Sequence, residues 1–301
     1  MKSLDLKLIH PRQMKQFLYK MDRYSEINLD YSINSGQVFL WEKFDNTWYG
    51  INGSDVISIT DSSNQLRTFS KNPTDLFRKG DDSKKIIQSI SRDKVVKSAV
   101  KRFSGLRLLR QDPFQCYISF ITSSNSNIQK IRFVLQNLCR KFGTKIRFED
   151  KEFFLFPEPD ILAKAKNSDL LKCGLGYRTK AVKEAASAVS LGKIDFDYLK
   201  ETNYHSAKES LVKIFGIGNK IADCIMLFSL DKLDAFPLDR WMIRVLQKYY
   251  SDKFSMKNKT ITEKTYENLH NEIVDYFGPY AGYSQQFLFK MERDLNEKKW
   301  L

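Results

Sequence analysis

The sequence predicts an α+β fold: an N-terminal antiparallel β domain that also holds helices, followed by an all-α body. Within the first hundred or so of the 301 residues, short runs of aromatic and β-branched residues are separated by turn residues, a pattern typical of short strands. Further along, apolar residues recur at steps of three and four, as in amphipathic helices. The length also suits two domains. We therefore expect domains at residues 1–103 and 104–301.

Three strands are expected in the N-terminal domain. Residues 37–44 (QVFLWEKF) are aromatic and partly alternating, and Asp45 and Asn46 after them suit a turn. The runs at 48–51 and 56–60 follow, with glycines between them. Short strands joined by tight turns indicate an antiparallel meander.

Seven helices are expected in the body. The clearest covers residues 128–142, where apolar residues face one side and Gly143 stands in the position of a C-terminal cap. The other six are expected at 178–190, 205–214, 220–230, 240–250, 263–277 and 280–296.

The charge of the chain points to a polyanionic partner. Fifty Lys and Arg against 36 Asp and Glu give a net charge of +14, and such an excess does not help a compact fold. Residues 101–150 carry ten basic and three acidic side chains. This cluster is either a phosphate-binding surface or an ordinary solvated helical face, and the whole-chain excess favours the first.

Several classes of protein are excluded by composition. No run of about 18 apolar residues is present, so no spanning helix is expected, and the first residues lack the apolar core of a secretory signal. The four cysteines form no C-x-x-C pair, and the three histidines are never four residues apart. We therefore expect an intracellular protein with no disulfide framework, no zinc or iron–sulfur site and no cofactor.

The segment 211–230 (LVKIFGIGNKIADCIMLFSL) predicts a helix-hairpin-helix at about residues 205–230. Its helical pattern is interrupted by Gly216-Ile217-Gly218 and then resumes. Two glycines around one apolar residue permit a tight turn with positive φ, and the backbone amides of such a turn suit a phosphate. A G-x-G motif alone is weak evidence for nucleic-acid binding, but between two amphipathic helices of a basic protein it indicates DNA binding.

Two polar side chains near this hairpin could carry chemistry. Lys220 falls in the first turn of the second helix, which is the unfavourable end for a cation. It is either a nucleophilic amine, a contact to a phosphate, or a partner of Asp223. Asp239 follows Phe236-Pro237-Leu238 and opens the next helix. It is either a simple cap or a carboxylate that stabilises a cationic sugar.

Taken together, these motifs resemble the helix-hairpin-helix, Gly/Pro-Asp superfamily of DNA glycosylases. Within it, the chain is similar to 8-oxoguanine DNA glycosylases/AP lyases of the eukaryotic type. Besides the hairpin and Pro-x-Asp, the resemblance rests on SGQVFLW (35–41), RQDP (110–113), FITSSN (120–125), GLGYR (174–178) and FGPYAG (277–282).

The resemblance implies a role for each matching residue. Lys220 would form a Schiff base and Asp239 would be the catalytic carboxylate. The flipped lesion would enter a pocket in which the Gly36 carbonyl accepts the N7 hydrogen that 8-oxoguanine has and guanine lacks. Cys224 and Phe289 would stack on the purine and Gln285 would read its Watson–Crick edge. Pro237 completes the implied pocket.

The DNA-binding residues implied by the resemblance surround that pocket. Asn125 and Tyr177 would fill the gap left by the flipped base, and Arg178 would hold the opposite cytosine. Lys130 and Trp241 stand where the family commonly has an arginine and a histidine, which puts strictness for cytosine and one phosphate contact in doubt. The remaining DNA contacts would come from Gly216 and Gly218. The hairpin carbonyls of Val212, Ile214 and Ile217 could hold a structural cation.

The sequence therefore predicts a bifunctional enzyme that excises 8-oxoguanine from duplex DNA and then nicks the strand by β-elimination. We expect a monomer that acts on double-stranded DNA, in nucleoid-associated cytoplasm or in a nucleus. Two alternatives stay open. One is a monofunctional alkylpurine DNA glycosylase that uses water and the aspartate alone. The other is a non-catalytic helix-hairpin-helix DNA-binding protein.

Overall fold

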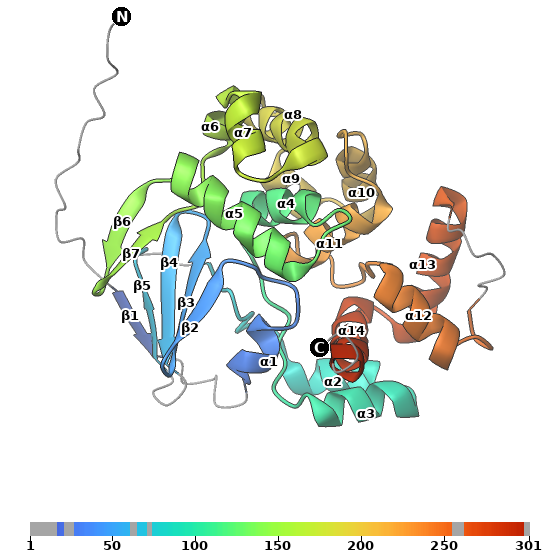
Figure 1. Cartoon of the computed structure of the whole chain (residues 1–301). Helices are drawn as coiled ribbons and strands as arrows, with labels where there is room; N and C mark the ends of the chain where they lie inside the picture. Colours follow the sequence, from blue (N-terminus) through green and yellow to red (C-terminus); the bar gives the residue numbers. More distant parts are fainter. Residues whose placement is uncertain (1–16, 21–26, 61–64, 71–73, 255–261, 298–301) are drawn as a thin grey trace, which may run out of the picture.

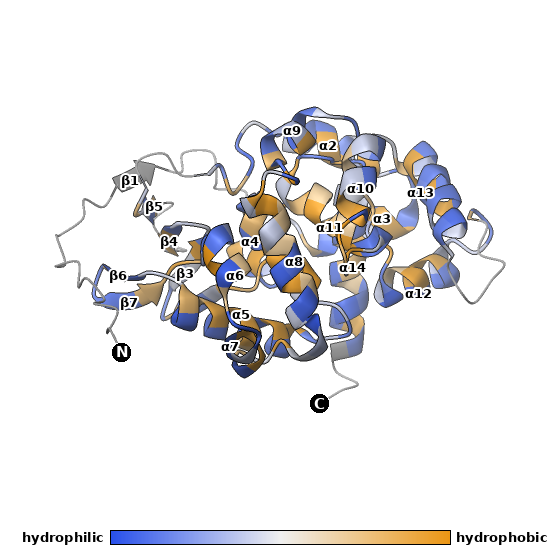
Figure 2. Ribbon diagram, turned by 90° about the horizontal axis from the view of Figure 1, so that it is seen from above, coloured by the Kyte–Doolittle hydropathy of each residue, from blue (hydrophilic) through white to orange (hydrophobic). Residues whose placement is uncertain are grey.

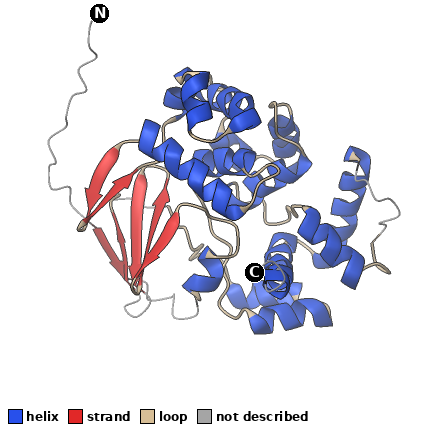
Figure 3. Ribbon diagram, in the orientation of Figure 1, coloured by secondary structure: helices blue, strands red, loops and turns tan. Residues whose placement is uncertain are grey.

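The computed structural model describes residues 17–20, 27–60, 65–70, 74–254 and 262–297. The first residues, in which no secretory signal was expected, lie outside this part of the chain. A sheet and a helical body lie side by side, with strands gathered at one side of the molecule and helices over the rest (Figures 1 and 3). The expected α+β architecture is confirmed. The boundary at residues 103 and 104 stays a prediction.

A five-stranded antiparallel sheet forms the N-terminal part, in the order β1-β5-β4-β3-β2. Its strands are β1 (Phe17–Lys20), β2 (Trp41–Phe44), β3 (Thr47–Asn52), β4 (Asp55–Thr60) and β5 (Gln65–Thr68). The expected meander is present as β2, β3 and β4, and the turn after β2 places Asp45 at a φ of +50°. The first expected strand is shorter than predicted, because residues 37–40 form a loop before β2.

The sheet packs one face around two tryptophans. Trp41 and Trp48 are buried with Ile57 and Leu66 in one apolar cluster. Trp41 pairs in register with Gly50, and a Cβ on that glycine would lie 2.0 Å from the Trp41 ring. Glycine is therefore required at this position because the indole occupies the space of a side chain.

A second, two-stranded sheet comes from the body but packs on the N-terminal sheet. It consists of β6 (Lys145–Phe148) and β7 (Lys151–Phe154). Ile146 and Phe148 are buried against Val56 of β4. The turn residue Glu149 accepts hydrogen bonds from the Tyr49 hydroxyl at 2.6 Å and from Ser58 at 3.0 Å. This hairpin was not predicted from the sequence.

Helices make up the rest of the described chain: α1 (Leu29–Ile33), α2 (Ser83–Ile90), α3 (Lys94–Arg102), α4 (Pro113–Thr122), α5 (Ile128–Phe142), α6 (Pro159–Lys164), α7 (Asn167–Lys172), η1 (Gly176–Arg178), α8 (Thr179–Ser190), α9 (Phe196–Glu201), α10 (Tyr204–Val212), α11 (Asn219–Ser229), α12 (Arg240–Tyr249), α13 (Glu263–Phe277) and α14 (Ala281–Glu297). All seven expected helices are present, with ends within two residues of prediction. The short α6, α7 and α9, and the buried α4, were not predicted.

The core of the body surrounds α4 and α11. Every residue from Ile221 to Ser229 on α11 is buried, and α4 is buried over nearly its whole length. Figure 2 shows the apolar colour gathered on these two central helices. Because α11 directly follows the glycine turn, the hairpin is anchored in this buried core.

Candidate active site

The predicted hairpin is formed by α10 and α11. Gly216 has a φ of +87°, and a Cβ there would lie 2.5 Å from the Cβ of Ala181. Ile217 is buried at 5 % exposure, as expected for an apolar residue packed at the turn. Gly218 differs from the prediction: its φ is −96° and open space lies where its Cβ would be. No side chain caps the start of α11, so its first N–H groups can face a phosphate.

Lys220 lies in the first turn of α11 and faces the end of α4. Its Nζ is 3.5 Å from the Ser123 hydroxyl and 5.6 Å from the centroid of the Phe120 ring. One turn further along α11, the Cys224 thiol is 3 % exposed. Burial raises the pKa of Cys224 to about 12, although the charge of Lys220 opposes this. The thiol is therefore uncharged at neutral pH and presents an apolar surface.

Asp239 is the N-cap of α12, and its Oδ1 accepts a hydrogen bond from the Met242 N–H at 2.8 Å. It follows a buried stretch that includes Pro237 and Leu238. Burial raises the pKa of Asp239 from its usual 3.8, while the α12 N–H groups and the charge of Lys220 lower it. The charges of Lys220 and Asp239 both act on the pKa of Cys224, and that of Lys220 acts on the pKa of Asp239, so these three predicted residues lie within electrostatic reach of one another.

Gly36 lies in a loop that is tied to the segment before α4 and to α14. The Gln37 side chain donates to the Arg107 carbonyl and accepts from the Leu109 N–H, each at 2.8 Å. From α14, Gln286 donates to the Ser35 carbonyl at 3.0 Å. Gly36 itself has a φ of +83°, so a non-glycine residue would be strained there.

The Gly36 loop meets the same face of α14 that carries the other predicted base contacts. A Cβ on Gly36 would lie 3.1 Å from the Phe289 ring and 3.1 Å from Nη1 of Arg293. One turn earlier, Gln285 is 4 % exposed, and its buried Oε1 has no hydrogen-bond partner. An orphaned buried amide oxygen is costly, and such a cost is recovered if a ligand supplies the missing donor.

Three further predicted residues form one cluster beyond α4. Asn125 has a φ of +47°, and the Arg178 guanidinium donates to the backbone carbonyls of Ser124 and Asn125. The exposed Tyr177 donates to the Ser124 carbonyl at 3.0 Å, and its ring lies under Arg178 at 4.4 Å. Arg178 is itself only 5 % exposed. Its expected contact to cytosine stays a prediction, and in this structure its donors hold the Asn125 loop.

The other predicted DNA contacts lie at helix starts. Lys130 is exposed in the first turn of α5 and Trp241 is half-buried in the first turn of α12, where it stacks with Arg244 at 5.2 Å. Of the hairpin carbonyls, that of Ile214 accepts the Ile217 N–H at 3.1 Å. No group of three or more His, Cys, Asp or Glu in the described residues is arranged to hold a metal. The carbonyl cation site that includes Val212 stays a prediction.

Comparison with known proteins decides the family. Residues 118–272 match the model of the HhH-GPD superfamily of base excision DNA repair proteins, and residues 21–117 match that of the 8-oxoguanine DNA glycosylase N-terminal domain. The chain belongs to the HhH-GPD superfamily. The resemblance inferred from the hairpin, the Pro-x-Asp and the outlying motifs is thereby confirmed.

Relatives within the superfamily include named enzymes. The chain is 28 % identical over 221 residues to a probable N-glycosylase/DNA lyase of Methanothermobacter thermautotrophicus, which covers 67 % of this chain and 68 % of that protein. It is 31 % identical over 197 residues to an N-glycosylase/DNA lyase of Arabidopsis thaliana, with 64 % of this chain and 53 % of that protein covered.

Solved structures agree with this assignment. The 8-oxoguanine glycosylase/lyase of Clostridium acetobutylicum, in complex with double-stranded DNA that contains cytosine opposite 8-oxoguanine, is 29 % identical, with a TM-score of 0.80 over 90 % of this chain and 93 % of that chain. The 3-methyladenine DNA-glycosylase of Archaeoglobus fulgidus is 16 % identical with a TM-score of 0.70, covering 93 % of this chain and 99 % of that chain. The second likeness shows the shared superfamily fold.

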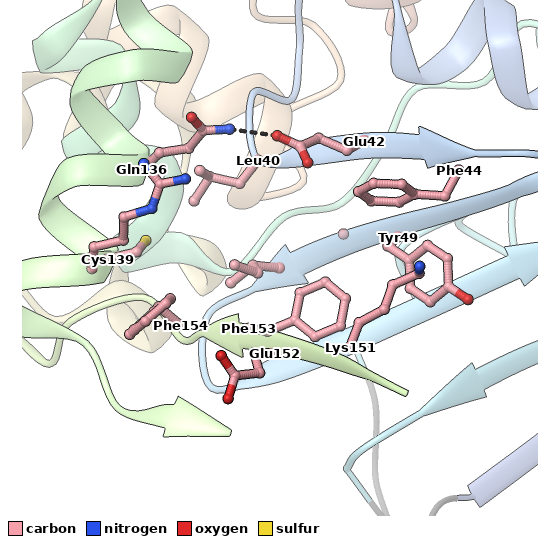
Figure 4. Close-up of a pocket in the computed structure, with 13 residues that line it drawn as sticks. Leu40, Glu42, Phe44, Tyr49, Gln136, Cys139, Lys151, Glu152, Phe153 and Phe154 are labelled. Carbon is pink, nitrogen blue, oxygen red and sulfur yellow. Dashed lines mark hydrogen bonds between the residues drawn. The ribbon is translucent and has the colours of Figure 1, made fainter. Parts of the chain in front are cut away.

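A cavity of about 420 Å³ lies apart from these residues (Figure 4). It is lined by aromatic side chains of β2, β3 and β7, and Lys151 lies 4.5 Å from the centroid of the Phe44 ring. The face of α5 that carries Gln136 and Cys139 closes it. None of the predicted site residues lines this cavity, so it is not the site that the superfamily motifs define.

The sequence did not single out some residues that hold the site. Ser123 touches Lys220, and Gln37 and Gln286 hold the Gly36 loop. Ser123 and Gln37 stand inside the quoted FITSSN and SGQVFLW motifs, so the motifs were a signal for them. For Gln286 the sequence held no signal besides its position next to Gln285.

The described part of the chain has no helix of the length and apolarity needed to cross a membrane.

Proposed function

We propose that this protein excises 8-oxoguanine from duplex DNA and then nicks the strand through a Schiff base on Lys220. One observation carries the proposal: Lys220, at the start of the hairpin's second helix, lies close enough to Asp239, at the start of α12, for its charge to lower the pKa of that carboxyl. A monofunctional glycosylase needs only the carboxylate. The relatives named N-glycosylase/DNA lyase support the same reaction.

The chemistry needs both groups in defined states. The neutral Lys220 amine attacks C1′ of the flipped nucleotide, and the bond from C1′ to the base breaks, with its electron pair leaving on the base. The Asp239 carboxylate stabilises the cationic sugar while this bond breaks. The attacking nitrogen then gives up a proton and the departing base takes one up; ring opening gives a protonated imine between C1′ and Lys220, and loss of a C2′ proton expels the 3′ phosphate by β-elimination.

Recognition of the lesion follows from the predicted pocket. The Gly36 carbonyl accepts the N7 hydrogen of 8-oxoguanine, and the unpaired Gln285 oxygen accepts from the edge of the base. Phe289 and the uncharged Cys224 thiol supply the two apolar faces, and Pro237 completes the wall. Guanine, which lacks that hydrogen, leaves the Gly36 carbonyl unpaired at a cost of about 1–3 kcal/mol.

The DNA around the lesion meets the remaining residues. Asn125 and Tyr177 occupy the gap, while Lys130 and Arg178 face the opposite base. The turn glycines contact phosphates on the lesion strand, and Trp241 meets the same strand by stacking in place of the phosphate contact that a histidine would make. This substrate places the protein with chromosomal DNA, in nucleoid-associated cytoplasm or in a nucleus.

Borohydride trapping on an 8-oxoguanine duplex tests the assignment. Wild type is expected to form a covalent protein–DNA adduct, and Lys220→Gln to form none while it still binds the duplex. Lys213→Gln is the matched control, because Lys213 is an exposed lysine of the same hairpin, paired with Glu209 at 2.9 Å; it should trap like wild type.

Each other outcome identifies an alternative. Undiminished adduct from Lys220→Gln would overturn the nucleophile. Excision without any adduct from wild type would indicate a monofunctional glycosylase, of the kind represented by the 3-methyladenine enzymes among the relatives. Binding without excision would indicate a non-catalytic DNA-binding protein.

A further inference from the structure

A fully buried polar cluster lies behind the predicted catalytic pair. Its centre is Asp223 of α11, which is 0 % exposed and stands three residues after Lys220. Oδ1 of Asp223 accepts a hydrogen bond from the Tyr204 hydroxyl at 2.7 Å, and Oδ2 accepts one from the Tyr266 hydroxyl at 2.5 Å. The amine of Lys208 lies 3.8 Å from Oδ1. These side chains come from α10, α11 and α13, so the cluster joins the hairpin to the C-terminal helices.

The cluster pairs the Asp223 carboxyl with a buried lysine. Lys208 is 6 % exposed, donates to the Tyr204 hydroxyl at 3.0 Å, and lies 4.6 Å from the Tyr266 ring centroid. His270 stacks on the Tyr204 ring at 4.3 Å, and burial with the nearby Lys208 charge lowers its pKa to about 3. Burial raises the pKa of Asp223, while Lys208 and the two tyrosine hydroxyls lower it, and the His270 imidazole stays neutral at physiological pH.

Tyr266 makes one contact that the other members do not make. Besides donating to Asp223, its hydroxyl accepts the Leu238 N–H at 3.1 Å. Leu238 is 4 % exposed and directly precedes Asp239. A single hydroxyl thus connects the helix that carries Lys220 with the peptide that carries Asp239.

We propose that Tyr266 is a positioning residue, which holds the Asp239 carboxylate at its working distance from the Lys220 amine. The proposal rests on the proposed function of that pair. Lys220 and Asp223 share one rigid helix, and Leu238 and Asp239 are neighbours. The bond chain from Asp223 through Tyr266 to Leu238 therefore fixes one reacting group against the other.

The physical reason lies in how steeply such reactions depend on geometry. A misplacement of about 1 Å can lower a rate by roughly 100-fold. The loop before Asp239 lacks regular secondary structure, so its position depends on such bonds. Because the Tyr266 hydroxyl is buried, no water replaces it at once when it is removed, and the Leu238 N–H is left unpaired.

Tyr204 offers a matched control. Its hydroxyl donates to the same carboxylate, and its other hydrogen bond is to Lys208 of its own helix. Tyr204→Phe therefore removes a comparable buried bond to Asp223 and leaves the link from Tyr266 to Leu238 in place.

The test compares Tyr266→Phe and Tyr204→Phe in the full chain. Single-turnover excision from an 8-oxoguanine duplex should slow roughly 10- to 100-fold in Tyr266→Phe, with the dissociation constant for a duplex carrying an abasic-site analogue unchanged. Tyr204→Phe should lose thermal stability to a similar degree and keep most of the wild-type rate.

The acidic limb of the pH–rate profile should move to higher pH in Tyr266→Phe alone, since a loosened loop weakens the cap that favours ionised Asp239. Equal rates in Tyr266→Phe and wild type, or equal losses in both variants, overturn the proposal.

A measurement without substrate separates this proposal from the function on which it rests. Amide hydrogen exchange at Leu238 should be faster in Tyr266→Phe than in Tyr204→Phe and wild type. If wild type fails to excise 8-oxoguanine, the proposed function fails, and this exchange still decides whether the bond orders the loop. Unchanged exchange at Leu238 in Tyr266→Phe overturns the positioning role whatever the substrate.

Discussion

The side chain of Asp239 lies where burial and ionisation compete. Burial alone would keep the carboxyl protonated, whereas the N–H groups of α12 and the charge of Lys220 favour the carboxylate. Burial prevails in part, so the pKa of Asp239 is raised from 3.8. Under the proposed function this group must be negative to stabilise a cationic sugar, and it is kept in surroundings that resist its charge, as is common at active sites.

Substitution of Asp239 by Asn should separate stability from activity. An acid whose pKa is raised by folding costs stability above both pKa values, and this cost disappears below the unfolded value. Asn keeps an N-cap oxygen without the charge, so Asp239→Asn should be at least as stable as wild type at pH 7 and lose this advantage near pH 3. Excision should fall by roughly 10²- to 10³-fold. Thermal unfolding at both pH values and single-turnover excision check this; a variant clearly less stable at pH 7 would contradict the burial argument.

Some site residues are readable from local sequence and others depend on distant contacts. Lys220 and Asp239 follow from a glycine turn and a Pro-x-Asp that act within a few residues. The buried position of Arg178 depends on hydrogen bonds to carbonyls more than fifty positions earlier. The hydrophobic periodicity of the sequence gives no sign of such a distant contact. The link from Tyr266 to Leu238 spans 28 positions and looks in the sequence like an ordinary helical tyrosine.

At the scale of the element, the two hairpin glycines have different structural roles. Gly216 has a positive φ and its α-hydrogens face Ala181, whereas Gly218 has ordinary backbone and open space beside it. The first glycine is needed to fold the turn. The second leaves room at the uncapped start of α11, where a phosphate would approach.

Substitution of each glycine by alanine should therefore affect a different property: stability at position 216 and DNA binding at position 218. Gly216→Ala should lower the free energy of unfolding by about 1–3 kcal/mol, because it adds backbone strain and a close Cβ contact with Ala181. Gly218→Ala should unfold like wild type but bind duplex DNA more weakly. Denaturant unfolding and a DNA titration of both variants measure this. Equal stability of the two variants would show that the turn does not need glycine at 216.

Element prediction succeeded where the pattern is local and failed where pairing is distant. The amphipathic helices of the body have periodicities that are visible within one window. The strands β6 and β7 are four residues each and are stabilised by burial against β4, about 90 residues earlier. The helices α2 and α3 lie before residue 103 but pack against α14, which their own sequences do not indicate.

For the whole molecule, the site depends on both ends of the chain. The Gly36 loop is held by Gln286 of α14, and the Gln111 N–H donates to the Phe228 carbonyl at the end of α11. Hydrogen bonds thus join the Gly36 loop to α14 and the segment before α4 to the hairpin, as one unit. Composition predicted the partner class of this unit through its net charge, but not how its parts meet.

That charge leads to a last prediction, on the salt dependence of DNA binding. Each phosphate neutralised should add about −0.9 to the slope of log K against log salt, so a steep linear decrease is expected between roughly 50 and 200 mM salt. Lys130 is an exposed cation at the start of α5, and an ammonium that faces the opposite base also lies close to the phosphates of that strand, so Lys130→Ala should make the slope shallower by about 1. Lys164→Ala is the control, because Lys164 lies in α6, outside the basic 101–150 segment, and is paired with Asp160 at 3.1 Å; its slope should equal that of wild type. A flat dependence in wild type would contradict a phosphate-binding surface, and equal slopes in all three proteins would remove Lys130 from it.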